Sequence, residues 1–211
     1  MKTRTIRVQG KGSASQAPDR ISLFFSVAHP RPQYDKAIEG CNSRVESIRA
    51  AASELNLQGA DLKTVQFGVS DETQYEHGRY THIGYTATHQ LCMELPVDQN
   101  LVGKFLSSLV QRGAEPQVRI NFTVADPEAL KQRVLADAVA NAKARAEVIA
   151  TAAGVKLGNI ADIQYGYSEV VISSQPSEMM LESCCESEIA PNFDPKDVDA
   201  EDTVTVTWEI D

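Results

Sequence analysis

Two histidines and a glutamate are the densest group of side chains in the sequence that could do chemistry. Glu76 and His77 are adjacent, and His82 follows beyond Gly78. Imidazole nitrogens and carboxylate oxygens bind metals, and the three side chains could meet across a hairpin turn. A zinc site needs three or four convergent ligands, however, and the segment lacks a fixed spacing such as H-E-x-x-H. A polar loop tip is the simpler interpretation.

A second candidate is the adjacent pair Cys184 and Cys185, which could be a redox pair or a grip for a soft metal. A reactive thiolate needs a positive field, whereas the neighbours here are acids. We therefore expect incidental exposed thiols. Cys41 falls on a helical apolar stripe and Cys92 in a strand, so both are expected to be small core or half-buried residues rather than parts of a disulfide framework.

Other signatures of catalysis or cofactor binding are missing. Gly10-x-Gly12 follows a strand, but no helix starts directly after it and a third glycine is absent, so it is not a dinucleotide or phosphate cradle. His89 lies on the apolar parity of its strand and is expected to be a half-buried, hydrogen-bonded histidine. No nucleophile elbow or Walker sequence is present. We predict no catalytic residue and no cofactor.

The charge is concentrated late in the chain. Of a net charge of -9 over 211 residues, residues 173–202 carry -8, because nine acids there face Lys196 alone. The rest is nearly neutral, which argues against binding nucleic acid or anionic membranes. No apolar run approaches the ~18 residues of a membrane span, and the amino terminus lacks the apolar core of a signal peptide. The sequence as it stands predicts a cytoplasmic protein, or an exported one if a signal was removed.

The candidate residues must be positioned by strands and amphipathic helices. Apolar spacings of three and four predict helices at 34–55, 98–113 and 127–154, the last with Asp126 as N-cap and many alanines for close packing. Alternation with period two predicts the strands. These strands are expected at 6–8, 21–27, 65–69, 83–95, 118–124, 160–165 and 204–210.

The resulting order, ββα-ββα-βα-ββ, predicts an α+β fold with a mixed, mostly antiparallel sheet and three helices packed on one face. We expect one domain over 1–211, although the pattern leaves open one sheet or two small subdomains. A stretch at about 168–202, rich in Ser, Glu, Asp and Pro, is expected to be a disordered or functional arm.

Several short segments together resemble the SIMPL-domain family, bacterial proteins of unknown function. Residues 8–19 resemble its opening V-x-G-x-G-x-x-x-x-x-P-D, and residues 83–87 its I-x-G-Y-x-A strand. Val102-Gly103 resembles its next helix, Phe122 with 126–128 its strand-to-helix step, and 154–158 its G-V-x-L-G exit. The resemblance covers nearly the whole chain. The missing signal peptide and the acidic arm depart from the family pattern.

The resemblance implies an α+β fold, frequent export to the periplasm and, in some members, ring-like or channel-like homo-oligomers. Protection against oxidative stress and an adaptor role beside a signalling kinase are associated with other members. No catalytic residues are carried over. The leading hypothesis is a non-enzymatic protein that self-associates or binds another protein through its sheet edges or arm. The alternative is a small-molecule or metal-binding protein that uses Glu76, His77 and His82.

Overall fold

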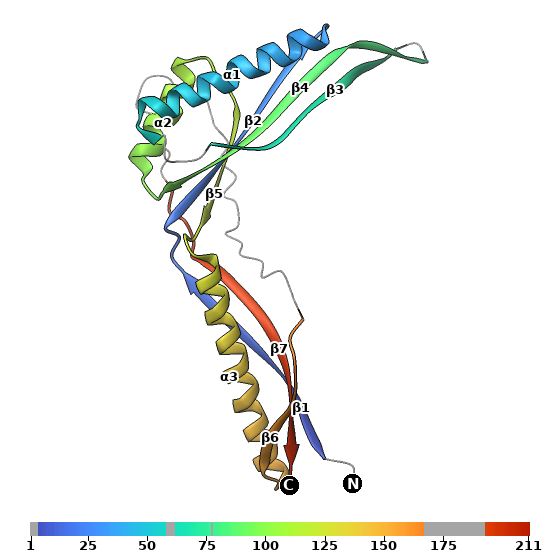
Figure 1. The fold of residues 1–211 in the computed structure, drawn as a ribbon, viewed down its shortest axis with the longest axis vertical. Helices are drawn as coiled ribbons and strands as arrows, with labels where there is room; N and C mark the ends of the chain where they lie inside the picture. Colours follow the sequence, from blue (N-terminus) through green and yellow to red (C-terminus); the bar gives the residue numbers. More distant parts are fainter. Residues whose placement is uncertain (1–3, 58–61, 77, 167–192) are drawn as a thin grey trace. The chain divides into compact units, whose positions relative to one another are not determined.

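A computed structural model describes residues 4–57, 62–76, 78–166 and 193–211, without the side chain of Glu76 (Figure 1). The elements follow the order ββα-ββα-βα-ββ, as predicted. They are β1 (Thr5–Gln16), β2 (Arg20–Arg31), α1 (Tyr34–Glu54), β3 (Lys63–Glu76), β4 (Arg79–Pro96), α2 (Gln99–Gln111), β5 (Gln117–Thr123), α3 (Pro127–Ala153), β6 (Leu157–Gln164) and β7 (Val198–Ile210).

These elements form two compact units, each with its own sheet. The first contains α3 and a three-stranded sheet in the order β1-β7-β6. The second contains α1, α2 and a four-stranded sheet in the order β3-β4-β2-β5. The α+β class is confirmed, and the open question of one sheet or two is answered by two. That both units fold as one domain over 1–211 stays a prediction.

The core of the second unit lies between its helices and one face of its sheet. Alternate residues of β2 and β4 are fully buried against the apolar stripe of α1, and Phe25 meets Phe105 of α2 edge-on at 5.8 Å between ring centroids. Cys41 is buried in this core, as predicted, and Cys92 is half-buried. Burial raises the pKa of both thiols, so neither is an activated nucleophile.

The first unit is built around α3, whose ends agree with the prediction. The side chain of Asp126 accepts a hydrogen bond from the backbone N–H of Ala129 at 2.9 Å, and Pro127 starts the helix. Gly154 ends it in the left-handed conformation, with φ of 68°. Every fourth residue is buried: Leu130, Val134, Ala138, Ala142, Ala146 and Ala150. The buried row continues to Ala150 and leaves its neighbour Ile149 exposed.

Two glycines of β1 let α3 lie directly on the strand. A Cβ added to Gly10 would lie 2.7 Å from Cβ of Ala142, and one added to Gly12 would lie 3.0 Å from Cα of Ala138. Real carbon atoms do not approach so closely, so only glycine opposite alanine permits this packing. This packing explains why glycines stand at positions 10 and 12, where the sequence had indicated only that they do not form a phosphate cradle.

Side chains of α3 also bond the outer backbone groups of β1, which is an edge strand. The carboxylate of Asp137 accepts from the N–H of Ser13 at 3.0 Å, and the amide oxygen of Asn141 accepts from Lys11 at 3.4 Å. Arg145 donates to the carbonyl of Gln9 at 3.3 Å. The helix thus provides partners for groups that would otherwise be free to pair with another strand.

The strands β1 and β7 are longer than predicted. The first strand is predicted only over residues 6–8, but β1 continues to Gln16 and pairs without a bulge as far as Val198 of β7. The arm expected up to residue 202 therefore ends earlier. Residues 198–202 belong to β7, where Val198, Ala200 and Asp202 are buried. The alternating pattern did not reveal this extension of β7, because the charged residue Asp202 stands at a position that faces the core. Its carboxylate accepts a hydrogen bond from the Tyr165 hydroxyl at 2.9 Å.

Gly10→Ala is expected to lower the free energy of unfolding by about 1–3 kcal/mol, the usual cost of overpacking, because the new methyl group collides with α3. Urea denaturation measures the change. Gly68→Ala is the matched control, since a Cβ at Gly68 meets nothing within 4 Å. Equal stabilities of the two variants would contradict the close packing of α3 on β1.

His29 connects the stability of the second unit to pH. Its ring lies under Gly40 of α1, where an added Cβ would collide with it, and its Nδ1 is buried without a partner among the described residues. Burial lowers the pKa of His29, with smaller contributions from the positive charges of Arg31 and Arg44. The folded protein therefore holds His29 neutral.

Because the folded pKa of His29 lies below its unfolded value of about 6.5, the unfolded chain takes up the proton first as the pH falls. The free energy of unfolding is expected to be highest above about pH 6.5 and to fall as the pH drops toward the folded pKa. Denaturant titrations between pH 7.5 and 5 measure this. His29→Gln should flatten the decline, whereas the same change at exposed His82 should leave it. A decline that persists in His29→Gln would assign it to other groups.

Candidate functional site

In the sequence, the predicted metal-binding residues fall between the end of β3 and the first part of β4. Of the three, only the side chain of His82 is described; His77 and the side chain of Glu76 lie outside the described residues. His82 is exposed, and its Nδ1 lies 3.9 Å from Oδ1 of Asp71 on β3. No group of three or more His, Cys, Asp or Glu side chains among the described residues could hold a metal ion. A site completed by residues 76 and 77 stays a prediction.

A β-bulge decides which side chains of the hairpin share a face. Glu72 pairs with Gly84 and Thr73 with His82, so Ile83 is the extra residue on β4. The expected unbroken alternation from Ile83 to Leu95 was therefore wrong at its start, and Ile83 is exposed. The bulge changes the parity, and His82 and Tyr80 consequently lie on the same face as Tyr85.

The result is a row of aromatic rings along the helix-side face of the hairpin. Tyr85 contacts Tyr34 at the start of α1 at 5.4 Å between centroids, and His82 at 4.7 Å. Tyr75 and Tyr80 face each other across the ladder at 4.9 Å, with 63% and 76% of their surface exposed. Tyrosine is favoured at interfaces because its ring is apolar and its hydroxyl tolerates water. The row was not predicted from the sequence, because its members on β4 are even-numbered before the bulge and odd-numbered after it.

His89 lies deeper, on the same face of β4, and is half-buried as predicted. Its Nε2 is 2.9 Å from the hydroxyl of Thr64, and its ring packs edge-on against Phe67 at 5.3 Å. Burial, and to a lesser degree Arg49, lowers the pKa of His89. Its contacts are those of a structural side chain, and no described carboxylate is bonded to it to form a catalytic relay.

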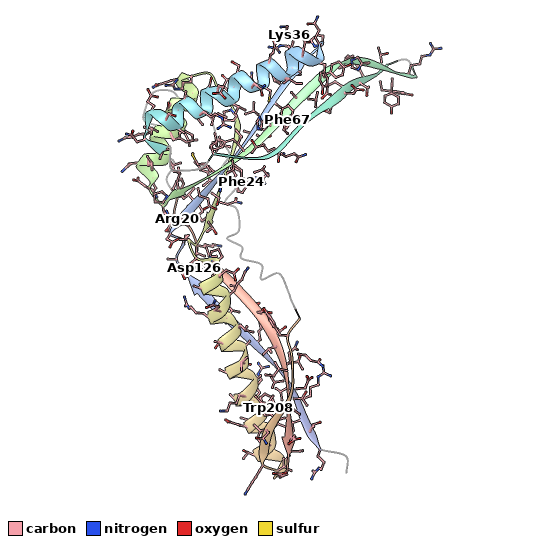
Figure 2. All side chains as sticks on the ribbon, in the orientation of Figure 1. Arg20, Phe24, Lys36, Phe67, Asp126 and Trp208 are labelled. Carbon is pink, nitrogen blue, oxygen red and sulfur yellow. The ribbon has the colours of Figure 1, made fainter. Side chains whose placement is uncertain are left out.

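The edge of the second sheet at β3 is open. Among its thirteen residues with described exposure, only Val69 and Glu72 are half-buried and the rest are exposed. Phe67, with 46% of its surface exposed, lies on this strand (Figure 2). At the edge strand β1 of the other sheet, in contrast, side chains of α3 bond the outer backbone groups. No such helical cap on β3 is found among the described residues.

The remaining candidates receive little structural information. Cys184 and Cys185 lie outside the described residues, as does the acidic arm up to residue 192. Within the described part of the chain, no helix is both long and apolar enough to cross a bilayer. The described residues therefore offer an exposed aromatic face and an open strand edge, which are features of a surface for protein contacts.

Two curated relatives are similar to this chain. Both are named 26 kDa periplasmic immunogenic protein, one from Brucella melitensis biotype 1 and one from Brucella abortus strain S19. Each is 28% identical over 163 residues, which cover 75% of this chain. The matched part spans 65% of the length of each relative.

A family model agrees with these relatives and with the resemblance seen in the sequence. The SIMPL model, described as a protein of unknown function (DUF541), matches residues 6–208. The match contains nearly all of β1 and of β7, and so extends over both units of the fold. The chain belongs to the SIMPL family.

Proposed function

We propose that the protein acts without catalysis, by assembling into homo-oligomers through the open side of its second sheet. The observation that carries the proposal is the contrast between two edge strands: α3 side chains bond the outer backbone groups of β1, whereas β3 is exposed along nearly all of its described residues. A strand of fourteen residues without a described cover at its edge invites pairing with another strand. The neighbouring tyrosines supply an apolar area that a partner can bury.

We further propose that the protein is exported to the periplasm and takes part in a stress response there. The Brucella relatives are named as periplasmic proteins, which supports export and gives no support to the cytoplasmic expectation. The stress role rests on the family resemblance alone. Fractionation of the native organism, before and after oxidant treatment, tests both.

Light scattering across a dilution series tests assembly directly. We expect a mass above that of the 23.0 kDa chain, falling toward it on dilution. A constant monomer mass at every workable concentration would refute the proposal.

Replacing Tyr75 and Tyr80 with serine should weaken association roughly 5-fold to 50-fold, because aromatic side chains often supply much of the energy of an interface. Sedimentation over a concentration series measures the dissociation constant. Val148→Ser on α3 is the control, since Val148 is 69% exposed and belongs to the other unit. An equal loss in both proteins would show a general effect of surface polarity rather than a specific one of the hairpin.

The pairing of His82 with Asp71 favours metal binding near residues 76–82 as the alternative function. In that case zinc should raise the melting temperature of the native chain, and His77→Ala combined with His82→Ala should abolish the rise. His29→Gln is the control, because His29 is buried under α1. A rise that survives the double substitution would place the metal elsewhere.

A further inference from the structure

Among the sheet edges, β3 is the best suited to accept a whole strand. The edge strand β6 has eight residues and two register shifts, which twist an edge away from a regular partner. The edge strand β5 has seven residues. In contrast, β3 has fourteen and pairs regularly with β4 from Gln66 to Glu72. Along these seven residues, the backbone groups of every second residue point outward at regular spacing, where a partner strand could bond them.

Gly68, in the middle of β3, has no packing role among the described residues. A Cβ added to Gly68 meets nothing within 4 Å, and the backbone there is not left-handed. Glycine weakens a strand interior, so neither its small size nor its conformational freedom is used by the described contacts of β3. Because a Cβ there points out of the plane of the sheet into open space, a substitution at Gly68 can test a partner at the strand edge without disturbing the unit itself.

We propose that β3 pairs antiparallel with β3 of a second copy, about a two-fold axis at Gly68. This inference rests on the proposed assembly and names the strand and the register that it uses. A two-fold axis perpendicular to a sheet pairs each residue with one on the same face, so the register can be tested against the pattern of side chains.

The side chains of β3 are complementary in this register. Phe67 of one copy lies opposite Val69 of the other, so two apolar side chains meet on each side of the axis. Further out, Gln66 lies opposite Ser70, and Lys63 opposite Glu72. These last two share a face because β3 has a bulge between Thr64 and Gln66, and both pair with even-numbered residues of β4. Each dimer would therefore contain two Lys63–Glu72 pairs of opposite charge.

Registers shifted toward the acidic half of β3 fit less well. An axis at Val69 places Phe67 opposite Asp71, and an axis at Ser70 places Val69 opposite Asp71. Both set an apolar side chain against a carboxylate. The charges of β3 therefore oppose these slipped registers while they favour the one at Gly68. A second copy is the natural occupant because the strand is complementary to itself: its basic end meets the acidic half of an identical strand.

The sharpest test uses the empty space at Gly68. Gly68→Glu should leave the monomer folded, since the position is open, but it places two carboxylates opposite each other across the axis. We expect the dissociation constant of the dimer to rise more than about 10-fold, measured by sedimentation. Gly68→Ser is the uncharged control and should change the dissociation constant little. An unchanged constant in Gly68→Glu would overturn the register.

A charge exchange tests the same register independently. Lys63→Glu alone, or Glu72→Lys alone, turns both attractive pairs into repulsive ones and should weaken the dimer roughly 5-fold to 30-fold. The two substitutions together restore opposite charges and should recover most of the affinity. Lys104→Glu on α2 is the control for net charge. Double and single variants that are equally weak would exclude the Lys63–Glu72 contact.

The outcomes separate this inference from the proposed function. A native chain that is monomeric throughout contradicts both. An oligomer that is unaffected by Gly68→Glu and by the charge exchange contradicts only the β3 register, and assembly then proceeds through another surface. Loss of association in Gly68→Glu, with circular dichroism equal to that of the native chain, supports both.

Discussion

A sheet ends in strands whose outer N–H and C=O groups need partners, and this constraint explains much of the architecture. In the first unit a helix satisfies it, because α3 lies on two glycines of β1 and its side chains reach around the edge. At the edge strand β3 of the second unit, no such helical contact is found among the described residues. The two units therefore differ in how an edge strand is treated, and the assembly proposed above would supply the partners that β3 lacks within the described part of the chain.

The glycines of the two sheets differ in structural role, because the role depends on what surrounds each of them. From sequence, Gly10 and Gly12 could only be excluded as a dinucleotide or phosphate cradle. Their role became visible once Ala138 and Ala142 lay above them, 126 or more residues later in the chain. Gly68 gave no signal in the sequence beyond its small size, and among the described residues nothing lies within 4 Å of a Cβ added there.

The sequence predicted those parts of the fold that depend on local periodicity and caps. The three helices, the N-cap at Asp126 and the order of strands followed from spacing and from a few polar residues at helix ends. What it could not predict depends on contacts between distant segments. Asp202 was assigned to a solvated arm because its carboxylate is buried only by virtue of Tyr165 and its neighbours. The aromatic row was missed because the bulge at Ile83 moves the outer tyrosines to the opposite parity.

The hydrogen bonds between α3 and β1 depend on two repeat lengths that differ slightly, so the bonding groups of the helix and of the strand line up only over a short stretch. Four residues of helix advance about 6.0 Å, whereas two residues of strand advance about 6.8 Å. Each step from Arg145 to Asn141 to Asp137 therefore loses about 0.8 Å of alignment, a mismatch that side chains can absorb for a few steps. One step further, Arg133 meets the side chain of Gln16 rather than the backbone. A straight helix can protect only a limited length of edge in this way, so a longer strand would need a curved helix or a different kind of partner.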